Sequence, residues 1–179
     1  MIDILICGDP SDHTLTEALL PALAARGGVC FSGEEHVAEQ GTVARYFVCE
    51  SEVVPKISVP AGILLFKDHM CSQQPTGVPD GFFCVMDSGN KQAADVLRGS
   101  KAAVITCGTG SKDTLSIASL EPERAEVSLQ RNLKTLGGTV LEPHDFSVLL
   151  SRPLAPGLIL FVSAVLLLSD VSLGDGFKL

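Results

Sequence analysis

Residues 1–28 read MIDILICGDPSDHTLTEALLPALAARGG, and this stretch decides the fold. Ile2–Ile6 is almost entirely apolar, which predicts a buried β-strand. Cys7–Ser11 follows as a turn, and either the end of this turn or Asp12 can cap a helix with apolar residues at helical spacing. Pro21 lies inside that helical pattern and should kink or split the helix, because proline cannot donate to the preceding turn. The stretch predicts the strand–turn–helix unit that opens an α/β domain.

The turn in this unit has the shape of a phosphate-binding turn but not its charge. Such turns need glycines for close approach of the backbone to the anion, and often a lysine that reaches forward. Here one glycine, Gly8, is present, and Asp9 and Asp12 place negative charge where an anion would sit. We therefore expect the geometry of the turn to be kept and its affinity for phosphate to be lost.

The composition is that of a globular protein and argues against one class of partner. Of the 179 residues, 46% are hydrophobic and 19% are charged, so one domain with a substantial core is expected. The formal net charge is −8, and the 13 Lys and Arg residues are scattered along the chain. No nucleic-acid partner is expected, because phosphate backbones are bound by clustered basic residues.

The six cysteines, at positions 7, 30, 49, 71, 84 and 107, contain no C-x-x-C pair. We expect buried, reduced thiols that act as small apolar side chains, which indicates a reducing compartment. The N-terminus shows neither a basic segment nor a cleavage site, so we expect no signal peptide and a cytoplasmic location.

One apolar segment, residues 153–168, raises the question of a membrane. A helix over Leu158–Leu168 would be roughly 17 Å long at about 1.5 Å per residue, well short of the roughly 30 Å hydrocarbon core of a bilayer. We expect a helix buried in the domain rather than a membrane-spanning one. As an alternative, the segment is partly exposed and packs on a partner protein or on a second copy, which would give a homo-oligomer.

The other apolar runs of the first half are short and continuous. They predict strands at 29–31, 45–49, 61–66, 82–86 and 102–107, with a polar connection at 33–41 and a helix at 91–98. Continuous apolar strands are expected when a parallel sheet is covered on both faces. The predicted fold class is therefore α/β, with a mostly parallel, doubly wound sheet flanked by helices.

The pattern changes after Gly108. Apolar and polar residues alternate at 114–119, 126–131, 139–142 and 145–150, which predicts a small antiparallel sheet appended to the parallel one. The glycine-rich segment Cys107–Asp113 is best explained as the turn between the two sheets. We expect a single domain, with a parallel core at 1–110, an antiparallel subsheet at 111–151, and a returning apolar helix and tail at 152–179.

Five stretches that follow predicted strands carry a family resemblance. They are Gly8–Thr14, Phe47–Ser51, Ile63–His69, Val85–Asn90 and Val104–Gly108. Taken in order, they resemble the central, ATP-binding domain of the Mur ligases, which folylpolyglutamate synthetases share. Mur ligases add amino acids to the peptidoglycan precursor, so the resemblance implies an ancestry related to the bacterial cell wall. It covers nearly the whole chain, although each motif is weak.

The same resemblance implies where a nucleotide would bind, and the sequence departs from the family there. In the family's phosphate loop, Ser11 replaces the second glycine, Asp12 replaces the lysine and His13 replaces the magnesium-binding threonine. A change from Lys to Asp turns attraction to the β- and γ-phosphates into repulsion. The cofactor-binding positions that carry over are therefore vestigial, and they are Gly8, Ser11, Thr14, Asp87 and Asn90.

Two residues are candidates for holding a metal. The resemblance places Glu50 at the strand-end glutamate that holds magnesium, where it could bind a divalent cation through one carboxylate oxygen. The alternative is an exposed glutamate at a strand end with no ligand. His69, beside Asp68, could be half of an acid–base or metal pair, or it could simply be solvated.

The sequence thus predicts a degenerate, non-catalytic Mur-ligase-like domain that binds an unknown small molecule or protein. We expect no catalytic residues and no cofactor, with ATP and Mg²⁺ only if the altered loop still binds them. A 179-residue chain has no room for the family's other two domains, so it could not complete the ligase reaction. The alternative is a small nucleotide-binding or small-molecule enzyme in which Glu50, Asp68 and Asp87 collect a metal at the carboxyl edge of the sheet.

Overall fold

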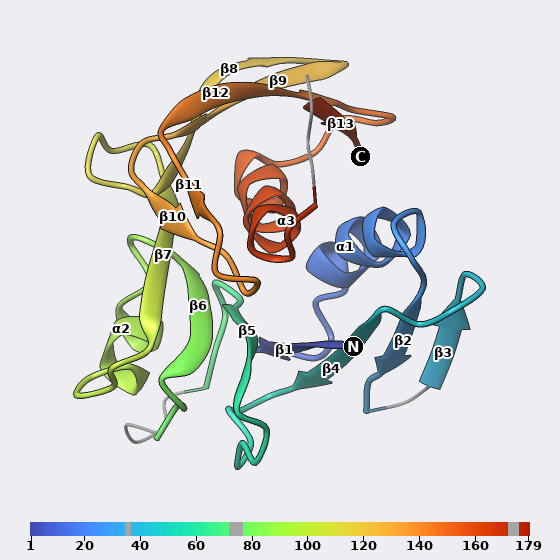
Figure 1. Cartoon of the computed structure of the whole chain (residues 1–179), viewed down its shortest axis with the longest axis vertical. Coiled ribbons are helices and arrows are strands. Elements are labelled where there is room, and N and C mark those ends of the chain that lie inside the picture. The colour runs from blue at the N-terminus through green and yellow to red at the C-terminus, as the bar shows by residue number, and fades with distance from the viewer. Residues whose placement is uncertain (35–36, 72–76, 172–175) are drawn as a thin grey trace.

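An eleven-stranded sheet is the framework of the computed structural model, which describes residues 1–34, 37–71, 77–171 and 176–179. The strand order is β13-β12-β9-β8-β7-β6-β5-β1-β4-β2-β3, and the sheet curves around helices α1 and α3 (Figure 1). The strands of this sheet are β1 (Ile2–Cys7), β2 (Val29–Ser32), β3 (Val37–Gln40), β4 (Tyr46–Ser51), β5 (Ala61–Phe66), β6 (Gly81–Asp87), β7 (Ala103–Gly108), β8 (Leu115–Glu121), β9 (Arg124–Leu129), β12 (His144–Leu149) and β13 (Gly176–Lys178).

The central part of the sheet is parallel and reverses its order beside β1. Every neighbouring pair is parallel in the run β7-β6-β5-β1-β4-β2. From β1 the chain first builds the side that contains β2 and β4, and then crosses to the other side with β5. Ligands of open α/β sheets bind at the carboxyl ends of the strands at such a switch point. The turn after β1 lies there.

Helices cover both faces of the sheet. Helices α1 (Thr14–Ala24) and α3 (Pro156–Leu168) pack on one face, whereas α2 (Lys91–Val96) packs on the other. Strands covered on both faces are expected to be continuously apolar, and β5 is buried at every residue after Ala61. The α/β class with a mostly parallel sheet between helices is therefore confirmed.

Helix α3 lies inside the larger core. All of its residues from Ile159 to Leu168 are buried, and Pro156 fits the first turn, where a helix needs no backbone donor. Within the part of the chain that the structure describes, no helix is long and apolar enough to cross a membrane. Residues 159–168 of the apolar segment are therefore covered by the fold of a single chain, whereas residues 153–158 are exposed or half-buried.

The antiparallel strands predicted after Gly108 are present, and they continue the parallel sheet. Strands β8, β9 and β12 pair antiparallel, as their alternation indicated, but β8 also pairs parallel with β7 and so extends the main sheet. A separate two-stranded sheet contains β10 (Leu133–Lys134) and β11 (Val140–Leu141). Alternation tells which side chains share a face, but it does not tell which strand is the neighbour.

Three local predictions also need comment. The polar connection predicted at 33–41 contains strand β3, although residues 35 and 36 lie outside the described part. Among the described strands, β3 pairs only with β2 at the edge of the sheet, so its side chains lack the burial that marks a strand in sequence. The predicted tail contains β13, with residues 172–175 not described. Helix α1 is not split, since it continues through Pro21.

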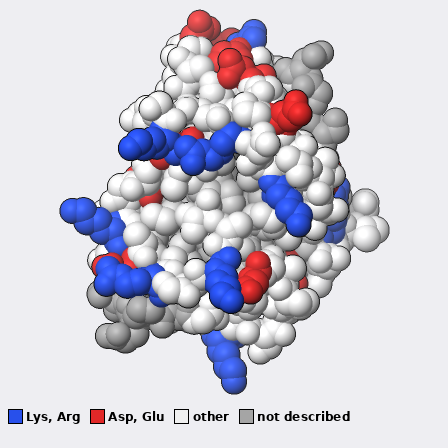
Figure 2. Space-filling model, turned by 60° about the vertical axis from the view of Figure 1, so that its left-hand side comes forward, with Lys and Arg blue, Asp and Glu red and all other residues white. Residues whose placement is uncertain are grey.

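Charged side chains are dispersed on the side of the molecule that carries β7 and α2. Figure 2 shows Lys and Arg side chains there as separate groups, with uncharged surface between them. No continuous basic patch is visible on this face. Such an arrangement lacks the clustered positive charge with which proteins bind nucleic-acid backbones.

All six cysteines are free thiols. Burial raises the pKa of the Cys7 and Cys84 thiols to about 12, and it also raises the pKa of Cys107. The prediction of buried thiols is confirmed for these three residues. Cys71, in contrast, is exposed and donates a hydrogen bond to Glu52 Oε1 at 2.8 Å.

Candidate functional site

The candidate site is built around the β1–α1 loop, residues 8–13, at the carboxyl edge of the sheet. Parallel pairing aligns Cys7 at the end of β1 with Ser51 of β4 and Phe66 of β5. The loop then bonds to both neighbours, because the Gly8 amide donates to Ser51 O at 3.1 Å and the Asp9 amide donates to His69 O at 2.9 Å. The ends of three strands therefore fix the loop.

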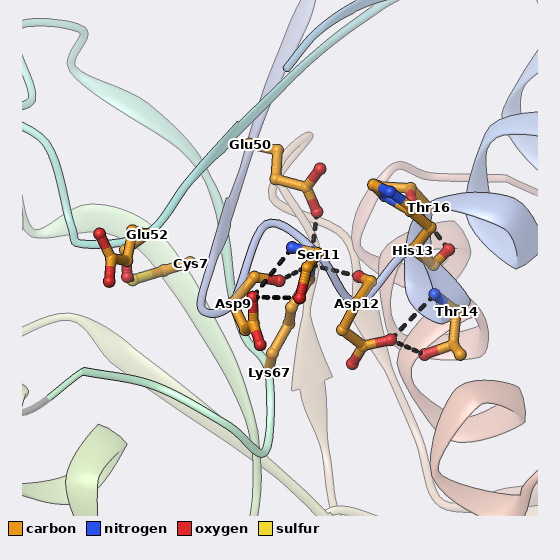
Figure 3. Close-up of polar contacts among 10 residues, drawn as sticks. All are labelled: Cys7, Asp9, Ser11, Asp12, His13, Thr14, Thr16, Glu50, Glu52 and Lys67. Atoms are coloured by element: carbon orange, nitrogen blue, oxygen red, sulfur yellow. Dashed lines mark hydrogen bonds and ion pairs between the residues drawn. The ribbon is translucent and has the colours of Figure 1, made fainter. Parts of the chain in front are cut away.

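The side chain of Lys67, which directly follows β5, fills this loop. The Lys67 ammonium donates to the backbone oxygens of Asp9 at 2.7 Å and Asp12 at 2.6 Å. It also forms an ion pair with Glu50 Oε1 at 2.5 Å (Figure 3). The side chains of Lys67 and Glu50 are 2% and 4% exposed. The loop thus directs carbonyl oxygens at an internal cation, whereas a phosphate loop directs N–H groups at an anion.

Gly8 makes room for this lysine. Its φ of +141° lies in a region that favours glycine. A Cβ added there would come within 2.6 Å of Lys67 Cβ and 2.8 Å of His69 O. The glycine expected to allow close approach of a phosphate instead allows close approach of the Lys67 side chain.

The two aspartates of the loop bind the loop's own donors. Asp9 Oδ1 accepts from the Ser11 amide at 2.9 Å and from Ser11 Oγ at 2.7 Å. Asp12 Oδ1 accepts from the Thr14 amide at 3.0 Å and from Thr14 Oγ1 at 2.6 Å. The hydrogen bonds from Ser11 and from Thr14 hold the pKa of each carboxyl below its usual value. Each carboxylate therefore already accepts the hydrogen bonds that Ser11 and Thr14 could otherwise donate to an external anion (Figure 3).

The five positions predicted to bind a cofactor fall into two groups. Gly8, Ser11 and Thr14 lie together in or beside the loop, as predicted. Asn90 lies at the start of α2, where its Oδ1 accepts from Ala93 N at 2.9 Å and its Nδ2 donates to Lys67 O at 2.9 Å. These bonds give Asn90 a structural role, since it caps α2 and holds the backbone of the residue that fills the loop.

Asp87 is the last residue of β6, and Asp68 follows β5 at the same edge of the sheet. Asp87 Oδ1 accepts from Gly89 N at 2.7 Å and so closes the turn before α2. Burial, and then the nearby charge of Asp87, raise the pKa of the Asp68 carboxyl. Like charges near one another have this effect because each disfavours ionisation of the other.

Neither predicted metal ligand stands in a set of metal ligands. Glu50 is buried and paired with Lys67, so the alternative of an exposed, unpartnered glutamate is wrong. His69 contributes its backbone oxygen to Asp9, and its imidazole belongs to no cluster of potential ligands. Among the described residues, no three His, Cys, Asp or Glu side chains are grouped to hold a metal ion. The metal assignment remains a prediction.

A cavity of about 950 Å³ lies beside the loop. Its walls come from the loop, the first half of α1, the ends of β2 and β4, and strand β3. The apolar part of the lining is made by Leu20, Pro21 and Phe31, together with Pro10 of the loop. The cavity is within the size range of small-molecule sites.

Comparison with solved structures gives a clear result for the fold. A UDP-N-acetylmuramoyl-L-alanyl-D-glutamate–2,6-diaminopimelate ligase matches 92% of this chain with a TM-score of 0.55 and 10% sequence identity. The fold is similar to that of the Mur ligases. A murein peptide ligase from Psychrobacter arcticus matches 95% of the chain with a TM-score of 0.55 and 14% identity. A UDP-N-acetylmuramate:L-alanyl-γ-D-glutamyl-meso-diaminopimelate ligase from Neisseria meningitidis matches 91% with a TM-score of 0.53 and 12% identity.

These matches cover most of this chain but a smaller share of each Mur ligase chain. This chain covers 43%, 44% and 60% of the three Mur ligase chains, in the order given above. It therefore spans less than half the length of the first two. Neither protein-family models nor curated proteins give a sequence match. The similarity to Mur ligases is one of fold.

Lys67 is the residue that sequence reasoning missed. It follows the fully apolar run AGILLF directly, at the carboxyl end of β5. A lysine so close to a buried strand end, beside a loop with two aspartates, is a signal for an internal ion pair. Its partner Glu50 occupies the corresponding end of β4, and both strands flank β1.

Proposed function

We propose that this chain is a non-catalytic, Mur-ligase-like binding module in which Lys67 closes the phosphate loop. The proposal is carried by the position of the Lys67 ammonium inside the β1–α1 loop. An ammonium donates three hydrogen bonds, and three acceptors surround it: Asp9 O, Asp12 O and Glu50 Oε1. Its donor capacity is therefore used inside the protein, and none of it is left for a phosphate oxygen.

The remaining donors of the loop support the same proposal. The amides and hydroxyls of Ser11 and Thr14 already donate to the carboxylates of Asp9 and Asp12. A nucleotide phosphate would have to break these bonds and then approach two carboxylates of its own sign. Both steps oppose binding of the nucleotide.

A catalytic role needs the site that this arrangement removes. Phosphoryl transfer is catalysed mainly by positioning the phosphates and by stabilising their charge. A loop filled by an internal ion pair supplies neither. The neighbouring cavity of about 950 Å³ is open to a ligand, which supports a binding role for the domain.

Calorimetric titration with ATP and Mg²⁺ at millimolar concentration tests the proposal. We expect no saturable heat from the wild-type chain. An Asp12→Lys variant, which restores the family's lysine, should also fail to bind, because Lys67 still fills the loop. Saturable binding of ATP by the wild type at micromolar concentration would overturn the proposal. Binding by Asp12→Lys alone would show that the charge reversal, rather than Lys67, prevents binding.

A further inference from the structure

The cavity beside the loop has a strongly acidic lining. It is bordered by five carboxylates and a single arginine, namely Asp9, Glu17, Glu34, Glu50, Glu52 and Arg152. A cleft lined by charges of one sign raises the local concentration of ligands of the opposite sign. The charges of this cavity therefore favour a cation, in contrast with the anionic nucleotide of a phosphate loop.

Glu50 provides a buried carboxylate for such a cation. Its side chain is 4% exposed, and it lines the cavity. Oε1 pairs with Lys67, while the second oxygen points away from that lysine (Figure 3). A carboxylate oxygen accepts hydrogen bonds and carries negative charge, so Glu50 can bind a donor in the cavity.

Arg152 already places a cation at the rim of the cavity. One of its terminal nitrogens lies 3.9 Å from Glu17 Oε2, and the two side chains are 57% and 63% exposed. An exposed pair at this distance is weak, because solvent screens it and both side chains lose conformational freedom. A ligand cation can therefore compete with Arg152 for Glu17.

The walls of the cavity indicate the rest of the ligand. Leu20, Pro21 and Phe31 provide an apolar surface next to the acidic groups. An apolar body with a charged end would bury its carbon atoms there and leave the charge with the carboxylates. A bare metal ion would use only the charge and none of this surface.

We propose that the cavity binds a small organic ammonium with an apolar body, with the ammonium placed between Glu50 and the rim glutamates. The inference rests on the proposed binding role and names the ligand class, but it does not depend on loss of nucleotide binding. The Lys67 ammonium already pairs with one oxygen of Glu50, and the ligand takes the other oxygen from the cavity side.

Three probes with the same body test the charge requirement. Benzylamine, benzyl alcohol and benzoate share a benzyl or phenyl group and are positive, neutral and negative at pH 7. We expect saturable shifts in amide NMR spectra with benzylamine, at residues that line the cavity, and none with benzoate. Equal binding of all three, or no binding of benzylamine, would overturn the inference.

Matched variants test the site. Glu17→Gln and Glu34→Gln should each weaken benzylamine binding by about two- to fivefold, as expected for a partly exposed pair. Arg152→Gln should strengthen it, because a competing cation is removed. Glu142→Gln, an exposed change after β11, serves as the control and should leave binding unchanged. Weakening by the control equal to that of Glu17→Gln, or weakening by Arg152→Gln, would contradict the inference.

The two proposals fail in different ways. Saturable ATP binding with intact benzylamine binding would refute the closed phosphate loop and keep the ammonium site. Absence of both would refute the ammonium site and leave the closed loop standing. Competition between ATP and benzylamine would refute the closed phosphate loop alone, since benzylamine would still bind in the cavity.

Discussion

Removal of the Lys67 ammonium should destabilise the fold through the partners that it leaves behind. In a Lys67→Met variant, Glu50 stays 4% exposed but loses its counter-ion. Breaking a buried ion pair by removing one partner costs about 3–5 kcal/mol. The backbone oxygens of Asp9 and Asp12 also lose a donor, although Asp9 is exposed enough for water to replace it. We therefore expect a loss of about 4 kcal/mol in the free energy of unfolding.

Urea unfolding followed by circular dichroism measures this loss. With an m-value of about 2 kcal/mol/M, the midpoint should fall by about 2 M. A Lys67→Met/Glu50→Leu variant should recover most of the loss, because apolar side chains of similar volume replace the pair. This double variant keeps the prediction testable even where the single variant does not fold.

An exposed lysine provides the matched control. Lys101→Met should change the free energy of unfolding by no more than about 0.5 kcal/mol, as expected for a surface substitution. A Lys67→Met variant as stable as Lys101→Met would refute the reasoning, because the ammonium would then contribute nothing inside the loop. Failure of the double variant to recover stability would refute the assigned pairing with Glu50.

The other predictions concern the loop and its neighbours. Hydrogen bonding from Thr14 lowers the pKa of Asp12 below its ordinary 3.8, so its contribution to stability is present above that pH and is lost as pH falls through the lowered value. Asp12→Asn should therefore be less stable than the wild type at pH 7. The gap between the two urea midpoints should begin to close as pH falls below about 3.8 and should vanish below the lowered pKa; a constant gap would contradict this. The Glu52 hydrogen bond and charge raise the pKa of Cys71, so Glu52→Gln should speed modification of this thiol at pH 8; an unchanged rate would count against that contact. Gly8→Ala should lower the free energy of unfolding by about 1–3 kcal/mol, because it strains the backbone and displaces Lys67. Gly157→Ala, which has open space around its Cβ position, is the control and should be nearly neutral. Equal losses for the two variants would remove the role given to Gly8.

The central strands could be predicted from sequence because strands buried on both faces are continuous runs of apolar residues. The run AGILLF forms β5 with the predicted bounds, and the strands at 45–49, 82–86 and 102–107 form within one residue or two of theirs. The edge strand β3 could not be predicted in this way. It pairs on one side only, and its residues carry no apolar pattern.

The sequence predicted where the candidate site lies, but not which side chain fills the loop. The strand–turn–helix pattern placed Gly8, Ser11 and Thr14 at the carboxyl edge, and the negative charge of the loop could be read from Asp9 and Asp12. The identity of the group inside the loop could not, because Lys67 is 55 residues from Asp12 in sequence. Only the pairing of β1 with β5 brings them together.

The central claim is that the Lys67 ammonium occupies the β1–α1 loop, and NMR of lysine ammonium groups tests it most directly. A buried, fully hydrogen-bonded ammonium exchanges its protons slowly and gives an observable signal, which the Lys67→Met/Glu50→Leu variant should lack. We predict that this signal is present without nucleotide and stays unchanged when ATP and Mg²⁺ are added to millimolar concentration. Proton exchange as fast as that of an exposed lysine, or a saturable shift of the signal with ATP, would contradict the account.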